Sequence, residues 1–236
     1  MILMSTIRNI GKAFAAVAVA SLLGTATASA QAHYDANLTV GVHAGAEVSR
    51  VFFNPSVQQK LPFGATAGVS FRYIEENHFG LIAELNFAQR GWEENFEEAP
   101  YHYRRTLNYI QIPVLAHIYF GRRGRFFFNA GPEIGFLIAE STSANFDPKD
   151  MATLPHFPNT NRMNEQMLMK AQNHVDYGIS AGLGGEFNVT EKHAVSVEAR
   201  FYYGLGNIFK SARTDVFAGS NSMSVSLTLG YLFRLK

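Results

Sequence analysis

The chain has 236 residues and no cysteine, and its 20 Lys and Arg nearly balance its 19 Asp and Glu. Without cysteine it has no disulfide, thiolate metal site or thiol nucleophile, and a net charge of +1 argues against a nucleic-acid partner. Charged residues make up 17% of the chain, below the roughly 25% of ordinary soluble domains. The mean hydropathy of −0.04 is too low for a bundle of membrane helices.

The first thirty residues have the layout of a secretory signal peptide. Arg8 and Lys12 give a basic start, an uncharged run follows, and Ala28 and Ala30 occupy the two positions that signal peptidase reads. The apolar run is about half the roughly 20 residues of a spanning helix. The alternatives are a membrane anchor or a buried helix, and the small residues Ala28 and Ala30 argue against both. We predict cleavage after Ala30, export from the cytoplasm, and one mature domain over residues 31–236.

Beyond the signal peptide, apolar residues alternate with polar or small ones, which is the period of a β-strand. Near the C-terminal end, for example, Val225 and Leu227 alternate with Ser224 and Ser226. The segments predicted as strands are residues 40–49, 63–73, 79–90, 106–120, 125–139, 175–187, 195–206 and 222–233. These eight segments run through the whole mature chain and leave no room for a linker or a second domain.

The connections between the predicted strands alternate in length. Short turns are expected at residues 75–77, 121–124 and 190–192, and long loops at 50–60, 91–105, 140–173 and 207–221. Barrels of the outer membrane have short turns on one side and longer loops on the other. The spacing therefore favours an up-and-down barrel.

Three features favour a barrel that faces lipid over a soluble barrel, whose apolar face points inward. The predicted strands have the length of tilted membrane strands, their polar face is mostly Gly, Ser and Thr, and their apolar face stays apolar in every segment. We predict an all-β fold, an eight-stranded antiparallel up-and-down transmembrane β-barrel. It would lie in the outer membrane of a Gram-negative bacterium, against lipid or lipopolysaccharide, with both termini in the periplasm. A soluble barrel of the export pathway is the alternative.

The last residues resemble the C-terminal assembly signal of outer-membrane barrels. That signal requires a polar residue, a glycine, an aromatic residue and a final hydrophobic residue, which are Thr228, Gly230, Phe233 and Leu235 in this chain. The alternative is a chance match in an amphipathic strand. The resemblance implies the barrel assembly machinery as a partner.

Charged residues on the polar faces are expected to point into the barrel. They are Glu47, Arg72, Glu84, Arg90, Glu133, Glu186, Glu198 and Arg200. Buried charges must pair, and side chains fill the lumen of a barrel with eight strands. Our interpretation is an internal network of ion pairs that plugs the lumen, and the alternative is a narrow gated pore or a proton path.

Candidate catalytic and metal-binding residues are few. His43 and His117 lie on polar faces, and some outer-membrane lipases and acyltransferases use His, but no nucleophile signature such as G-x-S-x-G accompanies them. The acidic run at 93–98, followed by His102, could ligate a hard cation, but it lacks a fixed ligand spacing. We interpret the histidines as lumen packing and the acidic run as a solvated loop, and we expect no catalytic site, metal or cofactor.

Other features carry structural expectations. The loop at 140–173 contains Met163 and Met167, and it either folds over the barrel mouth or offers an adaptable surface to a partner. Pro113 lies in mid-strand, where its missing N–H predicts a bulge. Interfacial belts are expected from the aromatic residues near strand ends: Tyr73, Trp92, Tyr119, Phe120, Tyr231 and Phe233.

Residues 109–115, Tyr-Ile-Gln-Ile-Pro-Val-Leu, resemble a strand of the PorT-like outer-membrane barrels of Bacteroidetes, with Tyr109, Gln111 and Pro113 at the pattern positions. Segments 41–45, 83–91 and 202–205 are similar to other strands of that family, in the same order. Since the founding member assists type IX secretion, the resemblance implies a structural or secretion-associated envelope component with type IX partners. A narrow pore or transport protein and an outer-membrane lipid-modifying enzyme are the alternatives, because fold does not fix function.

Overall fold

The computed structural model describes residues 37–76, 78–97, 99–158, 162–212 and 215–235. The predicted signal peptide and its cleavage site at Ala28 and Ala30 lie outside these residues. Within the described ranges, no helix has both the length and the apolar character needed to cross a lipid bilayer.

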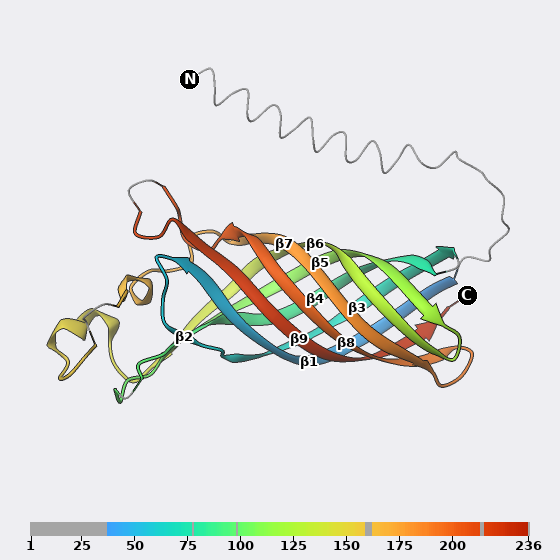
Figure 1. The fold of residues 1–236 in the computed structure, drawn as a ribbon, viewed down its shortest axis with the longest axis horizontal. Helices are drawn as coiled ribbons and strands as arrows, with labels where there is room; N and C mark the ends of the chain where they lie inside the picture. Colours follow the sequence, from blue (N-terminus) through green and yellow to red (C-terminus); the bar gives the residue numbers. More distant parts are fainter. Residues whose placement is uncertain (1–36, 77, 98, 159–161, 213–214, 236) are drawn as a thin grey trace, which may run out of the picture. The chain divides into compact units, whose positions relative to one another are not determined.

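Eight long antiparallel strands form one closed sheet (Figure 1). They are β1 (Asn37–Asn54), β3 (Phe63–Glu76), β4 (Phe79–Glu94), β5 (Tyr103–Gly121), β6 (Gly124–Ala144), β7 (Val175–Asn188), β8 (His193–Asn207) and β9 (Gly219–Arg234). Each strand pairs with the next along the chain, and β9 pairs with β1, so the ring has no free edge. The two-residue β2 (Gln59–Lys60) pairs only with the end of β4. The predicted eight-stranded up-and-down barrel is confirmed.

The apolar residues of the strands face outward. In β3, Phe63 and Phe71 are 72% and 49% exposed, whereas Thr66 and Arg72, which point inward, are 7% and 4% exposed. The outward series of β3 ends at Tyr73, ten residues beyond Phe63. At the tilt of a membrane strand this series spans about 25 Å, the height of the apolar belt of an outer-membrane barrel. The predicted orientation of the two faces therefore agrees with the structure.

Short and long connections lie at opposite ends of the barrel, as predicted (Figure 1). The strands extend further toward the long loops than the sequence indicates. β1 continues to Asn54, β4 to Glu94 and β6 to Ala144, and β5 already begins at Tyr103. The predicted loops at these places are shortened, and the longest connection contains two short 3-10 helices, η1 (Pro148–Thr153) and η2 (Glu165–Met167).

The predicted bulge at Pro113 is wrong. Pro113 pairs with Glu133 of β6, and the β4–β5 register is the same before and after it, although the pairing is interrupted opposite the proline. The register shift of β5 lies between Asn108 and Tyr109. A proline in this strand therefore removes a ladder hydrogen bond without inserting a residue.

The expectation of aromatic belts holds for some residues and fails for others. Tyr73, Phe120 and Tyr231 face outward and are 39%, 58% and 46% exposed. Trp92 and Tyr119 occupy inward positions of β4 and β5 and are 1% and 7% exposed. These two rings therefore belong to the interior of the barrel.

Candidate functional site

The middle of the lumen holds one arginine among three carboxylates. Arg90 of β4 places Nε 2.8 Å from Glu47 Oε1 and Nη2 2.9 Å from Glu133 Oε1, and its Nη1 is 3.9 Å from Asp176 Oδ2. Ser180 donates a hydrogen bond of 2.5 Å to Glu133. All five residues are at most 6% exposed. We call these residues the central cluster.

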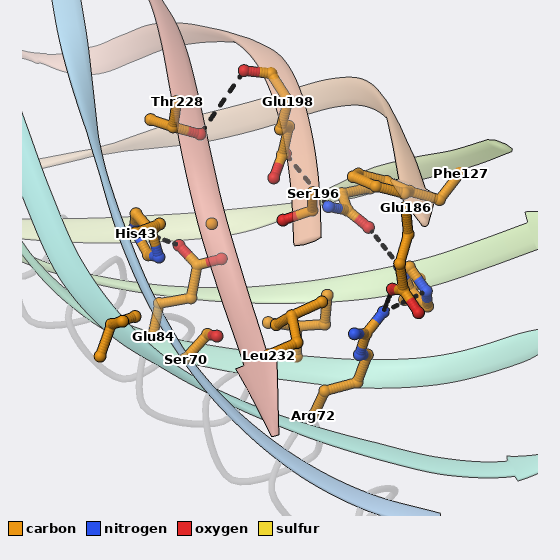
Figure 2. A pocket seen from close by; sticks show the side chains of 15 residues that line it. His43, Ser70, Arg72, Glu84, Phe127, Glu186, Ser196, Glu198, Thr228 and Leu232 are labelled. Carbon is orange, nitrogen blue, oxygen red and sulfur yellow. Dashed lines mark hydrogen bonds and ion pairs between the residues drawn. The ribbon is translucent and has the colours of Figure 1, made fainter. Parts of the chain in front are cut away.

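A second group of paired charges lies closer to the short turns, since Arg72 and Glu186 are near the ends of β3 and β7 that lead into them. Arg200 donates hydrogen bonds of 2.5 and 2.8 Å to the two oxygens of Glu84 and bonds of 2.9 Å to both oxygens of Glu198. Arg72 points toward Glu186, with its Nη1 2.6 Å from Oε2 (Figure 2). The two pairs made by Arg200 are bidentate, a geometry that strengthens hydrogen bonds between charged groups.

His117 and Asn129 connect these pairs to one another. His117 Nε2 is 3.1 Å from Arg72 Nη1, and its Nδ1 is 2.7 Å from Asn129 Oδ1. Asn129 in turn donates a hydrogen bond of 3.1 Å to Glu198. His43 lies on the other side, with Nε2 3.9 Å from Glu84. The cavity that remains among these residues is about 40 Å³, room for a few water molecules.

The structure places all eight predicted lumen charges inside the barrel and brings them into these two groups. The eight expected charges do not include Asp176 of the central cluster, nor Arg125, whose Nη1 is 3.4 Å from Glu186. Asp176 lies between Val175 and Tyr177, so the same alternation that gave the other charges could have found it.

Apolar side chains close the end of the barrel that carries the long loops. The strands contribute Val51, Phe53, Trp92, Leu107 and Tyr109, and the connections contribute Val57, Ala171, Ile208, Phe209 and Phe217. Phe53 stacks on Phe209 with ring centroids 5.9 Å apart, and it meets Trp92 edge to face at 5.4 Å. Phe209 and Phe217 are fully buried. We call these ten residues the mouth plug.

The long β6–β7 connection is fastened to the tip of β4 by charged and polar contacts. Arg162 Nη2 lies 2.6 Å from Glu94 Oε2, and Gln166 donates a hydrogen bond of 3.0 Å to Glu94 Oε1. Glu94 is only 2% exposed, so the expectation of a solvated acidic run is wrong at this residue. Its carboxylate is buried because the loop folds over it.

Aromatic packing holds the same connection from the other side. A cluster on the outer loops combines Phe96, Tyr103, Phe157 and Met167 with the partly buried Ala99, Tyr101, Phe146, Met151 and Leu154. Tyr103 also donates a hydrogen bond of 3.1 Å to the carbonyl of Met167. The methionine-rich loop is therefore packed against the outer ends of β4 and β5.

In the part of the chain that the structure describes, no three His, Asp or Glu side chains converge on a possible metal position. His102 of the acidic loop places Nδ1 3.9 Å from Glu93, and its side chain is 47% exposed. The family-pattern residues Tyr109, Gln111 and Pro113 all point into the barrel. Of the residues in the predicted C-terminal assembly signal, Phe233 pairs with Val40 of β1, whereas Leu235 follows the end of β9.

Comparison with solved structures finds other small barrels. Neisserial surface protein A is 12% identical and aligns over 85% of this chain and 99% of its own, with a TM-score of 0.46. OprG from Pseudomonas aeruginosa is 10% identical over 84% and 95% of the two chains, with a TM-score of 0.48. Ail, the attachment invasion locus protein of Yersinia pestis, is 14% identical over 83% and 98%, with a TM-score of 0.40. No curated protein sequence matches the chain.

The sequence itself matches a family model. Residues 29–210 fit the model described as "Outer membrane protein beta-barrel domain", which covers β1 to β8 and so seven of the eight strands that close the ring. The outward apolar belt and the polar, filled lumen are those of a barrel that lies in the outer membrane. The chain thus belongs to the outer-membrane β-barrel domain family.

Proposed function

We propose that the protein is a non-enzymatic, structural or secretion-associated component of the outer membrane, with a role like that of the PorT-like barrels. The barrel would anchor the chain, and the outer loops would make contact with other envelope proteins, including type IX secretion components. Both barrel termini and the short turns would then lie in the periplasm. Insertion by the barrel assembly machinery would use Thr228, Gly230, Phe233 and Leu235.

The observation that carries this proposal is the closed lumen. The mouth plug fills the outer end, and ion pairs fill the remainder, where the cavities lined by the charged residues measure about 40, 20 and 10 Å³. A barrel that is blocked in this way has no continuous path for a solute, which argues against the pore alternative. The fastened loops remain as a large surface with a defined shape.

The test is a gene deletion, complemented with the wild-type chain and with Arg162→Gln, which removes the ion pair between the β6–β7 connection and Glu94. We expect the deletion to reduce the amount of secreted protein, the wild-type chain to restore it, and the variant to restore it less at equal membrane abundance. An unchanged set of secreted proteins in the deletion strain would contradict the secretion role.

Two further measurements address the alternatives. We expect no steady conductance when the purified protein is reconstituted in a planar bilayer, and open channels would favour a pore. We also expect the lipid A of the deletion strain to match that of the parent. An altered acylation pattern would favour the lipid-modifying enzyme.

A further inference from the structure

The outer wall of the barrel carries a group of cations at the edge of its apolar belt that lies nearer the long loops. The cations belong to strands on the side of β1 to β5. Arg50 belongs to β1, Lys60 to β2 and Arg104 to β5. Beside them lie three large apolar side chains, Phe52, Leu61 and Phe63, which are 54%, 57% and 72% exposed. We call these six residues the basic rim patch.

The strand register brings two of the cations to either side of one aromatic ring. Phe63 pairs with Val48 of β1, and Arg50 lies two residues further, so its side chain leaves the same face about 7 Å away. From the opposite direction, Arg104 donates a hydrogen bond from Nη2 to the carbonyl of Phe63. Arg50 also lies over the Phe52 ring at 5.6 Å. The two guanidinium groups therefore lie on either side of Phe63, at the edge of the apolar belt nearer the long loops.

The patch has more positive than negative charge. With the described residues, none of Arg50, Lys60 and Arg104 forms an ion pair within 4.0 Å. Glu93 of β4 is the register partner of both Lys60 and Arg104, so one carboxylate lies among three cations, and its Oε1 is 3.9 Å from His102 Nδ1. Buried Nε of Arg50 has no hydrogen-bond partner among these residues.

We propose that the basic rim patch binds the phosphorylated headgroup of a glycolipid in the outer leaflet. Arginine recognises phosphate in a planar, two-pronged geometry, and its stem lies along apolar surface while its charged end stays at the interface. The acyl chains of the same lipid lie on Phe63, because this side chain belongs to the apolar belt that faces hydrocarbon. A soluble protein partner fits less well, since the patch borders the membrane.

This inference rests on the outer-membrane location and not on the secretion role. Loss of lipid binding would leave the secretion test unaffected, and an unchanged secretome would leave lipid binding unaffected. The two proposals can therefore fail separately.

The test measures binding of bisphosphorylated lipid A to the purified full barrel in detergent micelles by native mass spectrometry. The variant is Arg50→Gln with Arg104→Gln. The matched control is Lys170→Gln with Lys210→Gln, which removes two exposed cations from connections on the other side of the ring. Each barrel is first shown to be folded by its heat-dependent mobility on a gel.

We expect the Arg50 and Arg104 variant to bind bisphosphorylated lipid A about thirtyfold more weakly than wild type. This factor corresponds to a loss of about 1 kcal/mol of binding free energy for each arginine. The control variant should bind as wild type does, dephosphorylated lipid A should bind wild type weakly, and millimolar inorganic phosphate should not displace the lipid. Equal binding by the arginine variant, equal weakening in the lysine control, or displacement by inorganic phosphate would overturn the proposal.

Discussion

Arg90 is the residue on which the interior of the barrel depends most. One guanidinium group faces Glu47, Glu133 and Asp176, and its plane also lies over the Tyr202 ring with the guanidinium carbon 3.9 Å from the centroid. A buried charge that loses its partner pays the full cost of desolvation. Among the described residues, Arg90 is the cation that pairs with all three carboxylates, so its removal leaves them without these ion pairs.

We expect Arg90→Met to lower the free energy of unfolding by about 3–5 kcal/mol, since it leaves buried carboxylates without a cation. The measurement is urea unfolding of the barrel in phospholipid vesicles. Arg122→Met in the exposed β5–β6 turn is the control and should change stability by less than about 0.5 kcal/mol. Equal stabilities of the two variants would show that Arg90 does not hold the central cluster together.

At the scale of the element, the outward face of each membrane strand is apolar because it contacts the hydrocarbon of the membrane. Leu229 lies near the middle of the outward series of β9 and is 68% exposed. We expect Leu229→Arg to cost about 2–4 kcal/mol of stability in vesicles, because a charge would be placed in hydrocarbon. Leu168→Arg, on an outer loop and 54% exposed, should cost little. Similar losses at both positions would contradict a lipid-facing β9.

The β6–β7 connection should behave as a folded element and not as a free loop. Arg162→Gln removes the ion pair with Glu94 and the stacking of the guanidinium over Phe96 at 4.4 Å. We expect trypsin to cleave this variant several times faster than wild type at Lys149, which lies in the same connection. Cleavage in the exposed β5–β6 turn at Arg122 serves as the internal reference. No change in the ratio of the two cleavages would mean that the ion pair does not fasten the loop.

The sequence predicts the membrane part of the elements well and their outer ends poorly. Where one face meets lipid and the other a polar lumen, as from Phe63 to Tyr73, alternation identifies the strand and its orientation. Toward the mouth plug, Val51 and Phe53 point inward and Phe52 outward, so both faces are apolar and the period disappears. Pairings such as Arg90 with Glu133 join residues on different strands, and only the closed ring determines them.

At the scale of the whole molecule, β9 is the strand that completes the ring. Phe233 pairs with Val40 of β1 and with His193 of β8, so it lies where β9 is paired with both of its neighbouring strands. We expect Phe233→Ser to reduce the amount of heat-modifiable, folded protein in the outer membrane several-fold, because it removes the aromatic residue of the predicted assembly signal. Phe187→Ser, also outward and 58% exposed, is the control. An equal reduction in both variants would point to general loss of apolar surface.

The pairing of β1 with β9 also has a consequence for biogenesis. It joins the first and the last strand of the barrel, from Thr39 with Arg234 to Asn54 with Gly219. If the chain is exported from its N-terminal end, as the predicted signal peptide implies, β1 would reach the periplasm together with its partner β3 but long before β9. Until then the lipid-facing side chains would be in water, and we expect a periplasmic holding chaperone to shield them. The ring can close only once β9 has arrived, and a chain shortened before β9 would leave one edge of β1 unpaired.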